Sequence, residues 1–146
     1  LTTEIREKRG LVYSVYSYLY RYDKYNFFSG GAATSNENVH KVIKIIKEEL
    51  MKVKKKGVTE EELKNAKNYL INSYVLRLDS NKKIASILLN TQMDGLNIDF
   101  FEKRNDYINS VSQEDIKKIA NRILDENQIF FLVIGNPSNL KNINKI

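Results

Sequence analysis

The sequence predicts an α+β domain with two layers, in which a mainly antiparallel sheet carries helices packed on one face. Three observations lead to this fold class. Residues 11–33 show the two-residue period of strands in two runs, residues 34–124 carry apolar side chains at helical spacing, and residues 129–134 form an unbroken apolar run. Three strands cannot close a sheet, so the last one should return beside the first two.

The first element is expected to be a short helix. Leu1 and Ile5 are four residues apart and can share one helical face. Lys8 and Arg9 place cations in the last turn, where the helix dipole favours them. Gly10 is then expected to end this helix in the left-handed conformation.

An antiparallel hairpin should follow the helix. Its strands are expected at residues 11–22 and 25–33, with a turn at residues 23–24. The six tyrosines between positions 13 and 25 are typical of strands, and we prefer this explanation to a surface that stacks nucleic-acid bases. Gly30 and Gly31 lack the spacing of a phosphate loop and indicate a bulge or a close backbone approach.

Several local signals predict where the helices begin and end. Capping-box patterns, in which a Ser or Thr precedes an acidic residue by three positions, are expected to begin three of them. They lie at Thr34 with Glu37, at Thr59 with Glu62, and at Ser112 with Asp115. Periodicity predicts two further helices, one after Asp79–Ser80 and one over residues 100–111, while residues 138–146 should fray.

Length and composition indicate one globular domain over residues 1–146. The 42% hydrophobic and 29% charged residues are ordinary for such a domain, and no apolar run reaches the ~18 residues of a membrane span. The chain has no initiator Met and no signal-peptide pattern, so we interpret it as a fragment. The absence of Cys excludes disulfides, thiolate zinc sites and a Cys nucleophile. The net charge of +6 is dispersed, which does not favour nucleic-acid binding.

The junction between the first helix and the first strand holds the candidate functional residues. Arg6 lies just before the helix end and Tyr13 begins the strand, so both side chains can converge on one site as hydrogen-bond donors. A simpler interpretation stays open, in which Arg6 complements the helix C-terminus and Tyr13 packs. Arg9 competes with Arg6, because it is equally cationic and nearer to Gly10.

The stretch from Leu1 to Val15 resembles a signature of the pitrilysin/insulinase zinc peptidases, which include the mitochondrial processing peptidases. It has the form found in their second, non-metal-binding half. Further fragments follow in the family's order: Gly31–Thr34 with Asn36–Val39, Gly57–Leu63 with Ala66–Lys67, Asp79–Ser80, Asp94–Leu96, Val111–Ser112 with Asp115–Ile116, and Val133–Pro137. The resemblance implies that the chain is the C-terminal part of a non-catalytic peptidase half-domain, with its sheet facing a peptide chamber.

The same resemblance defines what chemistry to expect. In the family, zinc is held by an inverted His-x-x-Glu-His helix whose glutamate activates water. This chain has only His40, which we interpret as a surface residue, so no catalytic or metal-binding residue is expected in the fragment. Zinc is expected in the missing catalytic half. The resemblance implies that Arg6 and Tyr13 reach the substrate carbonyl near the scissile bond and stabilise the charge that develops there.

The sequence therefore predicts the substrate-binding half of a zinc metallopeptidase, inactive on its own. Its partners would be a peptide substrate and a catalytic half, located upstream in the same polypeptide or in another subunit. One alternative is a non-catalytic, peptidase-like assembly or binding subunit, and a second is a basic nucleic-acid-binding module. We expect the protein to be soluble and to function in the bacterial cytoplasm or periplasm, without a membrane span.

Overall fold

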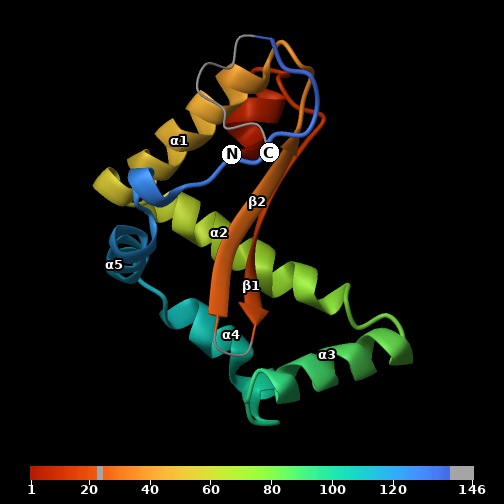
Figure 1. Cartoon of the computed structure of the whole chain (residues 1–146). Helices are drawn as coiled ribbons and strands as arrows, with labels where there is room; N and C mark the ends of the chain where they lie inside the picture. The colour runs from red at the N-terminus through yellow and green to blue at the C-terminus, as the bar shows by residue number, and fades with distance from the viewer. Residues whose placement is uncertain (23–24, 139–146) are drawn as a thin grey trace. The chain divides into compact units, whose positions relative to one another are not determined.

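The computed structural model describes residues 1–22 and 25–138 (Figure 1). The chain divides into two compact units. The first unit consists of Leu1–Lys54 and Ile123–Ile146, and the second unit is Lys55–Arg122. In the described ranges, one antiparallel pair of strands accompanies five α-helices, which confirms the α+β class. The elements are η1 (Thr2–Glu7), β1 (Ser14–Tyr22), β2 (Tyr25–Ala33), α1 (Val39–Lys56), α2 (Glu60–Val75), α3 (Asn81–Met93), α4 (Phe100–Ser110), α5 (Gln113–Ile123) and η2 (Glu126–Gln128).

The first helix, η1, is a π-helix that ends at Glu7, so Lys8 and Arg9 follow it and do not lie in its last turn as expected. The Lys8 N–H donates to the carbonyl oxygen of Thr3 at 2.9 Å, which is the wider π spacing. Gly10 then adopts the left-handed region with φ of 59°, and its N–H donates to the carbonyl oxygen of Arg6 at 3.0 Å. A side chain at position 10 would be strained there, so glycine is what lets the chain turn from η1 into the hairpin.

The hairpin of β1 and β2 is confirmed, although β1 begins three residues later than expected (Figure 1). Ser14 pairs with Ala33 and Tyr16 with Gly31, and the pairing runs without a bulge. The predicted turn at residues 23–24 lies outside the described residues. Of the two features expected at Gly30 and Gly31, a bulge or a close backbone approach, the structure has the close approach.

The two glycines of β2 make room for Tyr16. A Cβ added to Gly31 would lie 2.7 Å from the Tyr16 hydroxyl oxygen, because the ring lies over the bare backbone of its cross-strand partner. A Cβ added to Gly30 would lie 2.7 Å from the Tyr16 carbonyl oxygen, which is backbone and cannot move aside. The ring of Tyr16 also stacks on Tyr18, with 5.8 Å between centroids.

The main core of the first unit lies where η1, the start of the hairpin and α1 meet. It consists of Ile5, Val12, Val42 and Ile45, with Leu1, Leu11, Val15 and Ile46 packed around it. Most of the hairpin lies beyond this core. Aromatic side chains remain exposed on both of its faces, Tyr20 and Phe27 on one and Phe28 on the other. Within the first unit, the core therefore covers only one end of the hairpin.

The predicted capping box at Thr34 and Glu37 is wrong. Helix α1 begins at Val39, five residues after Thr34. The Thr34 hydroxyl instead donates to the carbonyl oxygen of Leu11 at 2.5 Å and ties the end of β2 to the segment before β1. The Thr34 side chain thus forms a tertiary hydrogen bond and not the helix cap that the local pattern predicted.

The predicted strand at residues 129–134 is also wrong. This segment forms no ladder with any described residue, and the sheet has only two strands. An apolar run indicates that a segment suits a strand, but strand formation requires a partner with free backbone groups. No such partner pairs with the segment within the described chain.

The second unit contains α2 to α5, and each helix begins where the sequence predicted, α3 directly after Ser80 and α4 at Phe100. Thr59 and Glu62 form a reciprocal capping box before α2. Before α5, Ser112 and Asp115 do the same, and the hydrogen bonds from Ser112 lower the pKa of the Asp115 carboxyl. No helix in the described ranges is both long and apolar enough to cross a membrane.

Candidate functional site

Arg6 is placed by its buried neighbour. Ile5 is 0% exposed and fixes one side of η1 against the core, so the next residue, Arg6, faces solvent. No carboxylate of the described residues forms a salt bridge with the Arg6 guanidinium. Arg6 also lies in the last turn of η1, which leaves the helix-end interpretation open.

Tyr13 is placed in the same manner. Val12 is buried in the core that holds Ile5, and Tyr13 follows it with 77% of its surface exposed. Its backbone is fixed, because its N–H donates to the carbonyl oxygen of Ala33 at 2.8 Å. The structure thus presents an anchored backbone with an exposed phenol, and the ring of Tyr13 is not packed among the described residues.

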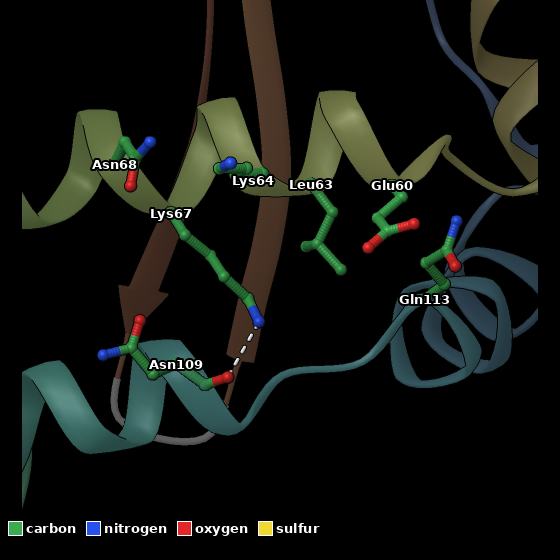
Figure 2. A pocket seen from close by; sticks show the side chains of 7 residues that line it. All are labelled: Glu60, Leu63, Lys64, Lys67, Asn68, Asn109 and Gln113. Atoms are coloured by element: carbon green, nitrogen blue, oxygen red, sulfur yellow. Dashed lines mark hydrogen bonds between the residues drawn. The ribbon is translucent and has the colours of Figure 1, made fainter.

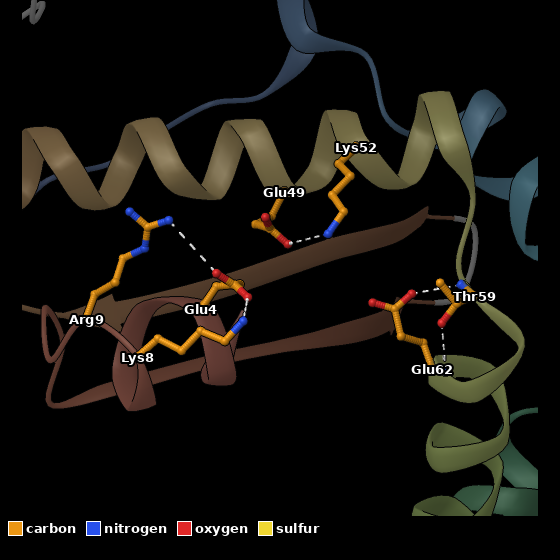
Figure 3. A network of polar contacts seen from close by, with 7 residues as sticks. All are labelled: Glu4, Lys8, Arg9, Glu49, Lys52, Thr59 and Glu62. Atoms are coloured by element: carbon orange, nitrogen blue, oxygen red, sulfur yellow. Dashed lines mark hydrogen bonds and ion pairs between the residues drawn. The ribbon is translucent and has the colours of Figure 1, made fainter.

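Glu4 distinguishes the two candidate arginines. Its carboxylate accepts a hydrogen bond from Lys8 Nζ at 2.5 Å and lies 3.9 Å from Arg9 Nη2 (Figure 3). Lys8, and then Arg9, lower the pKa of the Glu4 carboxyl. The ion pairs therefore help to hold η1 at neutral pH and lose this contribution as the pH falls through the lowered pKa. Arg9 is engaged in this cluster, whereas Arg6 is not.

A role for Glu4 was not predicted from the sequence. The available signal was its spacing of four residues from Lys8, since such a pair shares one face of a helix. On α1, which faces Glu4, the Glu49 carboxylate lies 4.0 Å from Lys52 Nζ (Figure 3). The Lys52 charge also lowers the pKa of Glu4, so the charges on η1 and α1 are complementary.

The residues present do not fit a zinc site. His40 is exposed on α1, and the described ranges hold no group of three His, Cys, Asp or Glu side chains suited to a metal. Structural and catalytic zinc sites need at least three protein ligands. We therefore derive no chemistry of this chain from zinc.

We expect the purified 146-residue chain to bind no stoichiometric zinc and to cleave no peptide, because it lacks the ligands and the water-activating glutamate. Elemental analysis after dialysis against a weak chelator tests the first part. A His40→Ala variant is the matched control. One zinc per chain that disappears in this variant would contradict our interpretation of His40.

A polar hollow of about 380 Å³ lies in the second unit between α2 and the residues around the start of α5 (Figure 2). Lys67 on its wall donates to the carbonyl oxygen of Asn109 at 2.7 Å, and Gln113 donates to that of Val58 at 2.6 Å. These side chains are thus used to tie helices together. Nothing in their arrangement indicates catalysis.

Comparison with known proteins identifies the family. The family model described as the peptidase M16 inactive domain matches residues 1–70, which include η1, the hairpin and α1. A crystal structure of the peptidase M16 inactive domain from Pseudomonas fluorescens matches with a TM-score of 0.71 and 27% sequence identity, covering 84% of this chain and 29% of that chain. The chain belongs to the peptidase M16 inactive-domain family, the non-catalytic half of zinc-protease-like proteins.

Two curated bacterial relatives extend the similarity beyond residue 70. An uncharacterized zinc protease of Streptomyces coelicolor is 32% identical over 127 residues, or 85% of this chain and 27% of that protein. A protein of Helicobacter pylori named as a non-peptidase homolog, YmxG, is 28% identical over 141 residues, or 93% of this chain and 32% of that protein. The chain thus spans less than a third of either relative's length.

Proposed function

We propose that the chain is the substrate-binding part of a zinc peptidase, in which Arg6 and Tyr13 hold the peptide carbonyl at the bond to be cut. The observation that carries this proposal is their common anchorage. Each follows a residue of one buried core, Ile5 and Val12, and each is exposed. Two donors of different charge are thereby carried by backbone segments packed on one core, and electrostatic stabilisation requires donors that are positioned in advance.

In this proposal, Arg6 and Tyr13 act as hydrogen-bond donors. When water attacks a peptide carbonyl, its oxygen gains negative charge, and a guanidinium and a phenol O–H stabilise this charge more than the neutral ground state. Arg6 supplies the positive charge, since Arg9 is paired with Glu4. Tyr13 supplies a neutral donor from a backbone held by Ala33.

The zinc and the attacking water would belong to a catalytic half in the same polypeptide or in a partner subunit. The name of the S. coelicolor relative, a zinc protease, supports this assignment. As part of the same proposal, the complete protein is similar to the mitochondrial processing peptidases. It would function in a bacterium, in the cytoplasm or the periplasm.

Changing Tyr13 to Phe in the complete protein is expected to lower peptide turnover by about fivefold, because it removes one neutral hydrogen bond of ~1 kcal/mol and keeps the ring. Turnover of a quenched fluorescent peptide measures this effect. Tyr25→Phe is the control, since Tyr25 is an exposed tyrosine at the other end of the hairpin. Equal turnover in both variants would remove Tyr13 from the site.

A second candidate function is binding or assembly without peptide cleavage. The name of the H. pylori relative, a non-peptidase homolog, supports it. The complete protein would then contain no zinc and cleave no peptide. The first proposal requires both bound zinc and peptide cleavage. Zinc analysis and turnover by the unaltered complete protein decide between the two.

A further inference from the structure

The carboxylate of Glu4 is bound through both of its oxygens. Lys8 Nζ donates a hydrogen bond to one oxygen at 2.5 Å, and Arg9 Nη2 lies 3.9 Å from the other (Figure 3). The Glu4 side chain is 26% exposed, compared with 61% for Lys8 and 53% for Arg9. Glu4 is therefore the most buried member of this cluster, and the two cations lie on its solvent side.

The ion pairs of Glu4 span the residue that we propose to bind the substrate. Glu4 precedes Arg6 in η1, whereas Lys8 and Arg9 follow the end of this helix. The contacts thus join the chain before Arg6 to the chain after it. Glu4 and Arg6 are only two residues apart, and side chains at this spacing do not share a helix face. Any effect of Glu4 on Arg6 therefore passes through the backbone.

Two other contacts hold the backbone around Arg6. The Gly10 N–H donates to the Arg6 carbonyl oxygen at 3.0 Å, and the Ile5 side chain is buried in the core. Both contacts leave residues 8–9 exposed, without a buried side chain to fix them. Glu4 supplies the side-chain contacts that hold this exposed part of the turn.

The charges around Glu4 favour its ionised form. The hydrogen bond from Lys8 lowers the pKa of the Glu4 carboxyl most, and the charges of Arg9 and of Lys52 on α1 lower it further. In return, Glu4 raises the pKa of Lys8, and the charge of Glu49 on α1 acts in the same direction. Glu4 is therefore ionised at neutral pH and holds both cations of the turn.

We propose that Glu4 is a positioning residue of the peptidase site, which holds the turn around Arg6 so that the guanidinium is aimed at the substrate carbonyl. In this role Glu4 contacts neither the peptide nor the zinc and acts only through Arg6. The role depends on the function proposed above for Arg6. Precise placement matters for such a donor, because a displacement of about 1 Å can lower a catalysed rate by about 100-fold.

A double-mutant cycle in the complete protein tests this role. Glu4→Gln keeps the size of the side chain and removes its charge, and we expect kcat per folded molecule to fall by about tenfold. The melting temperature should change little, since exposed ion pairs contribute little to stability. In the Arg6→Ala background the same change should cause no further loss, because no guanidinium is left to position. An equal loss in both backgrounds would overturn the proposal, since a purely structural effect does not depend on Arg6.

Two more variants make the outcomes distinguishable. Lys8→Met removes the shorter ion pair from its other side, so it should lower kcat by about the same factor as Glu4→Gln without adding to it. Glu7→Gln is the matched control, because Glu7 is exposed on η1 and forms no salt bridge with the described residues. An equal loss in Glu7→Gln would indicate an effect of net charge and overturn the proposal.

The parent variant separates failure of this role from failure of the proposed function. If Arg6→Ala itself keeps full turnover, the substrate-binding function fails and the role of Glu4 fails with it. If Arg6→Ala loses turnover while Glu4→Gln keeps it, only the positioning role is overturned.

Discussion

Replacing Arg6 with alanine in the complete protein is expected to lower peptide turnover by about 10²–10³-fold, the loss typical for removal of one oxyanion donor. Zinc content and thermal stability should change little. Arg6 is exposed and forms no salt bridge with the described residues, so its removal leaves no buried group without a partner. Steady-state kinetics with a peptide substrate and a melting curve for each variant measure the two effects.

Arg9→Ala is the matched control for this experiment. Arg9 has the same charge three residues later but is paired with Glu4, so its loss should leave turnover nearly unchanged. If Arg9→Ala were the inactive variant, the assignment within the motif would be wrong although the function could stand. If neither variant lost turnover, the substrate-binding role would fail. Lower stability with unchanged turnover per folded molecule would support the helix-end interpretation of Arg6.

Ile5→Ala is expected to lower the free energy of unfolding of this chain by about 2–5 kcal/mol, the usual cost of deleting three buried carbon atoms and leaving a cavity. Ile5 is 0% exposed and belongs to the small core that joins η1, the start of the hairpin and α1. Urea denaturation followed by circular dichroism measures the change.

The matched control for this core variant is Ile98→Ala, which removes the same atoms from a side chain that is 84% exposed. Its effect should stay within about 0.5 kcal/mol. Equal losses in the two variants would show that the cluster around Ile5 does not hold the first unit together. The contrast matters for the site, because this core anchors both Arg6 and Tyr13.

Features determined by neighbouring residues were predictable from the sequence. Gly10 turns the chain after η1 as expected because glycine adopts its left-handed backbone without strain. The capping boxes at Thr59 and Ser112 form as expected because donor and acceptor lie three residues apart on an exposed surface. The two strands of the hairpin likewise form where the alternation of apolar and polar residues predicted them.

Features determined by distant partners were not predictable. Thr34 was assigned to a helix cap, but Leu11, 23 residues away, offers a carbonyl oxygen that only the folded chain brings near. Residues 129–134 suit a strand, but no strand in the described part of the chain pairs with them. In the candidate site, the motif was enough to indicate Arg6 and Tyr13. The ion pair between Arg9 and Glu4 could not be predicted without the geometry of η1.

The ring of Tyr16 over Gly31 links the evolution of two positions on neighbouring strands. A methyl group at position 31 would meet the tip of a mobile side chain, so it is tolerated once the ring moves or residue 16 becomes smaller. At position 30 the obstacle is the backbone of residue 16, and no substitution there offers relief. Descendants of this sequence should therefore keep glycine at position 30, while alanine at position 31 should appear only together with a smaller residue at position 16.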